Sequence, residues 1–160
     1  FPFAEVHAFE PFPKFYHILE GICKINANIT PYHFALSDVE SKDTLIINKS
    51  EGTNSLFRSN VDKDHPHHDL LMPVSRVDVF TKKLDNLFPT QTIDLLKLDL
   101  QGGEYEALQG AKNLLTQNRI KCIICEVMFQ KSYKNQRNAS ELLSFLPQFF
   151  ADFLTLTIFF

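Results

Sequence analysis

The spacing of apolar and polar positions changes several times along the chain. Residues 5–9 form a short apolar-rich stretch that ends at Glu10, and this stretch predicts a strand. Apolar residues at helical spacing then predict a helix over residues 14–26, and residues 30–38 predict a second strand. The first part of the chain is therefore predicted to run strand, helix, strand. Further on, residues 44–48 and 75–80 flank a polar loop and predict an antiparallel excursion.

The second half returns to an alternation of strands and helices. Apolar runs at residues 93–100 and 121–128 predict buried strands. Helical spacing predicts helices over residues 104–118 and 139–146. This alternation predicts a single α/β domain, with a mostly parallel sheet covered by helices on both faces.

Composition narrows the class of protein. A chain of 160 residues, 44% of them hydrophobic, is long enough for one globular domain. The net charge of -3, with no basic stripe, argues against nucleic acid as a partner. No apolar run approaches the roughly 20 residues that cross a bilayer, so we expect no membrane partner and a cytoplasmic location. Residues 153–160 predict a buried strand, and the three cysteines predict reduced core thiols.

Candidate chemistry lies where the predicted strands end. In an open parallel sheet, ligands bind beyond the carboxyl ends of the strands, and three strands here end in Glu10, Asp99 and Glu126. A carboxylate at such a position can accept hydrogen bonds from the two hydroxyls of a ribose, and Glu10 is the best candidate for that role. The alternative is a surface acid that caps the following helix.

Lys97 and Asp99 lie two residues apart on a predicted strand, so their side chains point to the same face. They form either a structural ion pair or part of a catalytic site. The glycines at 102 and 103 let the backbone approach a ligand closely, which explains why the strand breaks there. A second acid near Glu126 would raise the pKa of one of the pair and make that residue a general base.

Two further patterns are weaker. His65, His67 and His68 match no standard zinc spacing, so we predict a solvated loop and no metal site. Cys122 and Cys125 lie within a predicted strand with their thiols facing opposite ways, which argues against redox chemistry.

Several short segments occur in the order seen in the FkbM-family methyltransferases, and the chain resembles that family from about residue 6 to about residue 150. The segments are AFEP (8–11), ALSD (35–38), TNSL (53–56), residues 93–111, CEV (125–127) and Tyr133. The resemblance implies a Rossmann-like class I sheet and an S-adenosylmethionine-dependent O-methyltransferase. Its substrate would be a small molecule with a hydroxyl group, such as a sugar or another metabolite. The chain departs from the family by Gly at position 103 and Gln at position 101.

The resemblance also implies roles for individual residues. Glu10 would hold the ribose of the cofactor, the 35–38 turn would lie beside the adenine, and Asp99 would lie at the reaction centre. The residues expected to bind the cofactor are Glu10, Ala35, Leu36, Asp38 and Asp99. Those expected to act in catalysis are Lys97, Asp99 and Glu126.

A glycine-rich turn is expected about 20 residues before the ribose acid, but only nine residues precede Glu10. We therefore expect the first strand with its cofactor loop, and the last strand, to be missing from this chain. Residues 6–9 and 95–98 should then be parallel but separated by the width of one strand. On its own the chain should be inactive. The alternative is a non-catalytic remnant that acts as a binding module.

Overall fold

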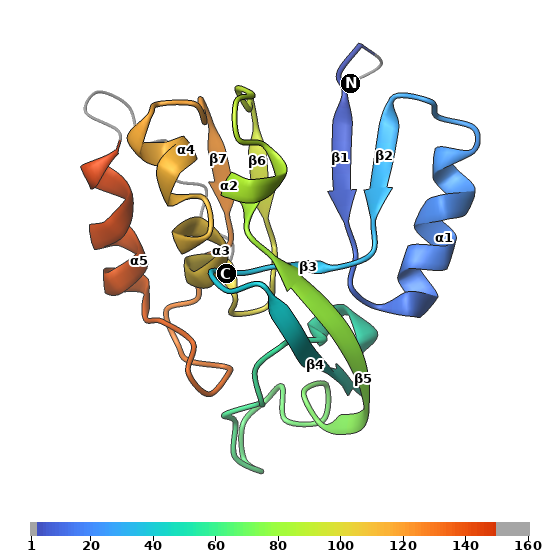
Figure 1. Cartoon of the computed structure of the whole chain (residues 1–160). Coiled ribbons are helices and arrows are strands. Elements are labelled where there is room, and N and C mark those ends of the chain that lie inside the picture. The colour runs from blue at the N-terminus through green and yellow to red at the C-terminus, as the bar shows by residue number, and fades with distance from the viewer. Residues whose placement is uncertain (1–2, 150–160) are drawn as a thin grey trace.

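The computed structural model describes residues 3–149. Its strands form three small sheets, with orders β1-β2, β3-β5-β4 and β6-β7 (Figure 1). The first and third sheets are parallel pairs, and in the second sheet β4 runs antiparallel to β5. The α/β class is as expected. The described residues form small, mostly parallel sheets rather than one continuous sheet with helices on both faces.

The first pair follows the predicted order. Strand β1 (Val6–Phe9) leads to helix α1 (Pro13–Cys23) and then to β2 (Ile29–Tyr32). Proline suits the first turn of α1 because its fixed φ is helical and the N–H it lacks would have no partner there.

The second predicted strand, residues 30–38, is split in two. After β2 the chain turns, and β3 (Ala35–Leu36) pairs with β5 in a different sheet. Phe34 lies at the turn, with its ring 5.7 Å from that of Phe9 and 5.5 Å from that of Tyr32. This aromatic packing fixes the bend, which the apolar pattern alone does not reveal.

The antiparallel excursion is confirmed. Strand β4 (Ser41–Asn48) pairs along its length with β5 (Pro73–Lys82), and these two form the crossed ribbons in the lower half of Figure 1. The 3₁₀ turn η1 (Glu51–Thr53) lies in the loop between them. A small apolar cluster of Leu45, Ile47 and Val79 holds the ribbon together.

The second half contains β6 (Leu96–Leu98), β7 (Ile123–Cys125) and the helices between them. The helix predicted over residues 104–118 is broken into α3 (Glu104–Gln109) and α4 (Lys112–Thr116). At the break, a Cβ on Gly110 would lie 2.1 Å from the carbonyl oxygen of Ser37. The chain therefore approaches β3 more closely than any side chain would allow.

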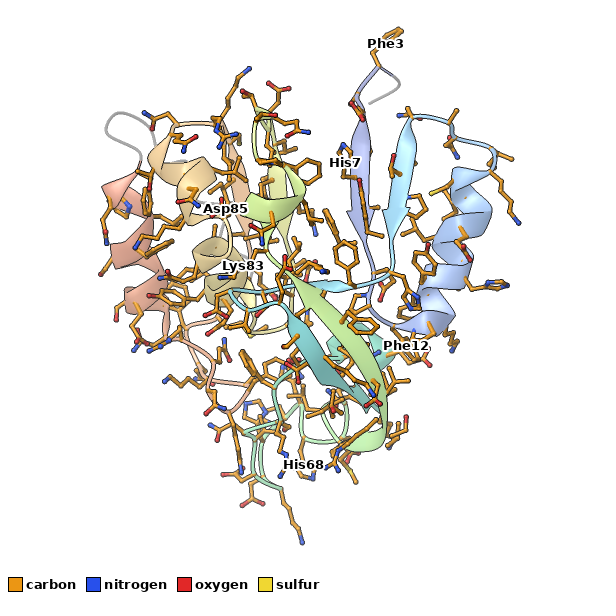
Figure 2. The ribbon with its side chains drawn as sticks, viewed as in Figure 1. Phe3, His7, Phe12, His68, Lys83 and Asp85 are labelled. Atoms are coloured by element: carbon orange, nitrogen blue, oxygen red, sulfur yellow. The ribbon has the colours of Figure 1, made fainter. Side chains whose placement is uncertain are left out.

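The side chain of Asp85 completes this break. Asp85 lies in α2 (Leu84–Leu87), and its two carboxylate oxygens accept the N–H groups of Asn113 and Leu114, both at 2.9 Å (Figure 2). These N–H groups lie in the first turn of α4, where a helix has no backbone partners for them. A side chain remote in sequence thus caps the second short helix.

The main core lies between the β6-β7 pair and the surrounding helices, where Leu98, Leu108 and Leu114 are 0–1% exposed. The helix predicted over residues 139–146 is present as α5 (Ala139–Phe145), followed by the 3₁₀ turn η2 (Leu146–Gln148). A capping box between Asn138 and Glu141 begins α5.

Strands β1 and β6 belong to different sheets, as expected for residues 6–9 and 95–98, and no ladder joins them within residues 3–149. A side-chain contact links β1 to the segment that follows α2. His7 of β1 meets the ring of Phe88, which follows α2, at a centroid distance of 4.7 Å (Figure 2). The strand predicted over residues 153–160 lies outside the described residues. In the described part of the chain no helix is both long and apolar enough to cross a membrane.

Candidate active site

Two acids meet at the carboxyl ends of β6 and β7. In this parallel pair Leu98 is opposite Cys125, so Asp99 and Glu126 are the next residues on each strand. The backbone N–H of Glu126 donates to the carbonyl of Leu98 at 3.1 Å, which continues the pairing one step further. The fold therefore brings together two of the acids that the sequence singles out.

Lys97 and Asp99 form the ion pair that their spacing predicts. Lys97 Nζ lies 2.9 Å from Asp99 Oδ2, and the two side chains are 61% and 52% exposed. An ion pair this exposed contributes little to stability. The other oxygen of Asp99 accepts a hydrogen bond from Gln101 Nε2 at 3.0 Å. Asp99 is therefore held from two sides while remaining open to solvent.

The turn after Asp99 has an unusual backbone. Gln101 and Gly102 have positive φ values of 53° and 97°. A side chain on Gly102 would begin 3.0 Å from the ring of Tyr133, so this position requires glycine for both reasons. Gln101 is held in its conformation by Ser55 Oγ, which donates to its carbonyl at 2.7 Å. Tyr133 Oη donates to Gln101 Oε1 at 3.1 Å. The break after β6 is thus a rigid turn.

Glu104, at the start of α3, is the buried acid of the site. Its side-chain oxygens accept the N–H groups of Leu100 at 2.7 Å and Gly102 at 3.1 Å, so it ties the turn closed. The residue is 5% exposed. Burial raises the pKa of Glu104 to about 7, and the negative charge of Glu126 adds to this effect. No individual role for Glu104 follows from the sequence alone. The available signal was an acid that directly follows two glycines at a helix start.

Glu126 is half-buried, and burial raises the pKa of its carboxyl. The charge of Asp99 raises this pKa further, while Lys97 lowers it. The direction agrees with the general-base hypothesis. Its Oε2 is buried and has no hydrogen-bond partner within residues 3–149. A buried, unpartnered carboxylate oxygen can accept a proton from a bound hydroxyl.

Glu10 lies at the end of β1. Its Oε1 accepts the N–H of Phe12, the N-cap residue of α1, at 2.7 Å. This contact is the helix-capping role considered as the alternative for Glu10. Burial raises the pKa of its carboxyl. The second oxygen makes no hydrogen bond within the described residues, so one acceptor remains for a ligand.

The 35–38 segment lies between the two parallel pairs. Ala35 and Leu36 are 8% and 5% exposed in β3, so their side chains pack in the interior. Asp38 is half-buried, and its charge adds to the burial that raises the pKa of Glu106 in α3. Because Phe34 contacts Phe9, the segment is near the Glu10 end of β1 as well as α3.

The remaining candidates are not gathered into a site. The rings of His65 and His67 lie 5.6 Å apart in the loop before β5. Among residues 3–149, no three His, Cys, Asp or Glu side chains are grouped as a metal site requires. Cys122 is exposed whereas Cys125 is buried, as their opposite directions predict. Burial raises the pKa of Cys125 to about 12, which leaves it a thiol.

The family model described as the methyltransferase FkbM domain matches residues 3–153. Comparisons with curated proteins and with solved structures gave no match.

Proposed function

Because the chain belongs to the FkbM methyltransferase family, we propose that it acts as an S-adenosylmethionine-dependent O-methyltransferase on a hydroxyl group of a small metabolite or sugar. The family supports methyl transfer in general, whereas the cofactor and the acceptor are part of the proposal. The observation that carries it is the position of Asp99 and Glu126 directly after the paired residues Leu98 and Cys125, at the carboxyl ends of β6 and β7. This is the edge at which parallel sheets bind ligands.

The chemistry assigned to these residues is modest. S-adenosylmethionine, when bound, supplies an electrophilic methyl group on sulfur. Glu126 Oε2, which is buried and has no hydrogen-bond partner among residues 3–149, would take up the proton that the acceptor hydroxyl gives up. Asp99 raises the pKa of Glu126 and so increases its basicity, while Lys97 holds Asp99 in place. General-base catalysis of this kind contributes about 10²–10⁴-fold, and alignment of the reactants contributes the rest.

The cofactor residues fit in part. Glu10 has one carboxylate oxygen without a partner among the described residues, and that oxygen can accept a ribose hydroxyl. Asp38 is half-buried, and its charge acts on Glu106 in α3. Its carboxylate is the group in the 35–38 segment that we assign to the cofactor. Ala35 and Leu36 can contribute through their backbone, since their side chains are buried.

Calorimetry with S-adenosylmethionine tests the proposal on the full gene product. Glu10→Ala should weaken binding by about 1.5–3 kcal/mol, the loss expected for hydrogen bonds to a charged group. Asp99→Asn should lower turnover more than it lowers cofactor affinity. If Glu10→Ala binds S-adenosylmethionine with wild-type affinity, Glu10 is not part of the cofactor site. If the full product does not bind S-adenosylmethionine, the proposal is refuted.

A second candidate function is a binding module that holds no cofactor. The observation in its favour is that β1 and β6 lie in separate sheets. The resemblance to the family implies a strand between these positions, together with the loop that cradles the cofactor. Residues 1–160 alone should therefore bind S-adenosylmethionine with a Kd of about 1 mM or weaker. If the full product binds as weakly, the binding module is the better description.

A further inference from the structure

A separate hollow lies on the β4-β5 side of the molecule. It has a volume of about 390 Å³ and is lined by both strands together with residues 56–58 and 134–135. Ligand sites for small molecules span about 300–1,000 Å³, so this cavity has the size of one. It shares no lining residue with the Asp99 and Glu126 site.

The charges in this cavity are unbalanced. Arg58, Arg76 and Lys134 line it together with a single acid, Asp43. None of the three cations forms an ion pair within the described residues, whereas Lys42, on the same strand as Asp43, is paired with Asp78 at 2.7 Å. Asp43 Oδ1 accepts the N–H of Thr44 at 2.7 Å, and the three cations outnumber this one acid in the cavity lining. In a chain of net charge -3, three unpaired cations around one hollow mark a site for negative charge.

Backbone hydrogen bonds fix the main-chain positions of the three cationic residues, whose side chains are exposed. Arg76 of β5 is opposite Ile46 of β4, and Ile46 in turn bridges to Ser55, three residues before Arg58. The N–H of Lys134 donates to the carbonyl of Arg58 at 2.7 Å. The cations come from three separate segments, yet their backbones are fixed relative to one another. A ligand therefore meets a frame that is already formed.

We propose that this cavity binds the oxyanion group of a small molecule, namely a phosphate, sulfate or carboxylate. Arg58 and Arg76 can each donate two parallel N–H groups to such an oxyanion, and Lys134 supplies a third positive charge. Leu56 and Phe57 offer an apolar wall for the rest of the ligand.

The cavity is linked to the acid site through Tyr133. This buried residue precedes Lys134, and its hydroxyl hydrogen-bonds Gln101, which in turn hydrogen-bonds Asp99. These hydrogen bonds connect Tyr133, the neighbour of the lining residue Lys134, to Asp99. Oxyanion binding in the cavity does not rest on the proposed function.

The test is calorimetry on the chain with glucose 6-phosphate, glucuronate, inorganic phosphate and glucose, without S-adenosylmethionine. We expect at least one of the three anions to bind with a Kd below about 1 mM, to weaken as salt is raised, and glucose not to bind. Binding of glucose 6-phosphate or inorganic phosphate would indicate a phosphate ligand, and binding of glucuronate would indicate a carboxylate ligand. Either result supports the proposal. Equal binding of glucose and its phosphate, or no binding of any anion, would overturn it.

Variants locate the site. Arg58→Gln and Arg76→Gln should each weaken binding of the anion by about five- to tenfold. The effect is no larger because these arginines are exposed and their charges are partly screened by solvent. Lys24→Gln, an exposed lysine after α1 with the same change of charge, should have no effect. Asp43→Asn should tighten binding, since it removes the only acid in the cavity lining. An equal loss of anion affinity in Lys24→Gln and Arg76→Gln would show that the anion responds only to the net charge of the protein. That result would contradict the proposed site. All these readouts are independent of methyl transfer, so failure of the proposed function leaves them intact.

Discussion

Glu104 is the residue whose ionisation is most strongly shifted by the fold. Its raised pKa of about 7 means that the folded state holds the Glu104 proton more tightly than the unfolded state does. The contribution of Glu104 to the free energy of unfolding is therefore greatest below its ordinary pKa and is lost as pH rises to about 7. The loss is on the order of 3 kcal/mol.

The Glu104→Gln variant should remove this dependence. Urea unfolding at about pH 5 and pH 8 should show a smaller fall in stability with rising pH for the variant than for the wild type. Some dependence should remain, because burial also raises the pKa of Glu10, Glu106 and Glu126. Asp64→Asn, a change in the exposed loop before β5, should behave as wild type. Equal slopes for wild type and Glu104→Gln would contradict the assignment.

Gly102 is the residue at which the backbone is most constrained. Gly102→Ala introduces a Cβ at φ 97° and 3.0 Å from the Tyr133 ring, so the variant should lose about 1–3 kcal/mol of stability. Gly21→Ala is the matched control. Gly21 lies inside α1 with nothing within 4 Å of an added Cβ, so this change should stabilise the protein by about 0.5–1 kcal/mol. Thermal unfolding of the two variants measures both effects. A rise in the unfolding temperature of both variants would contradict the requirement for glycine at position 102.

At the scale of elements, α4 depends on a cap that comes from α2. Asp85→Ala removes the acceptor for two N–H groups of α4, so it should destabilise the protein by about 0.5–2 kcal/mol. Asp85→Asn retains an oxygen acceptor and should lose less. Denaturant unfolding of both variants tests this. Equal stability of Asp85→Ala and wild type would mean that solvent replaces the cap without loss.

The elements also show how far the sequence is informative. Strands β1, β4, β5 and helices α1 and α5 follow from their apolar spacing. The breaks at residues 33–34 and at Gly110 do not, because each depends on a contact with a segment distant in sequence. Phe34 packs on Phe9, and Gly110 lies against Ser37. Local pattern predicts an element, whereas its interruption is decided by tertiary packing.

At the scale of the whole molecule, the three sheets are held together by side chains and loops rather than by one continuous ladder. The pairing of Asp99 with Glu126 was predictable, because parallel strands place their carboxyl ends at one edge. The buried role of Glu104 was not, since it needs the positive-φ turn at residues 101–102. The Arg58, Arg76 and Lys134 cavity was not either, because its cations come from three separate segments.

The most direct measurement is transfer of a labelled methyl group from S-adenosylmethionine to a panel of hydroxyl compounds by the full gene product, compared between wild type and Glu126→Gln. We expect transfer by the wild type and a loss of about 10²–10⁴-fold in Glu126→Gln, with cofactor affinity retained. Asp64→Asn, a change in the exposed loop before β5, should transfer at the wild-type rate. Transfer by Glu126→Gln at the wild-type rate, or cofactor binding with no transfer to any hydroxyl by the wild type, would contradict a methyltransferase reaction centre at Asp99 and Glu126.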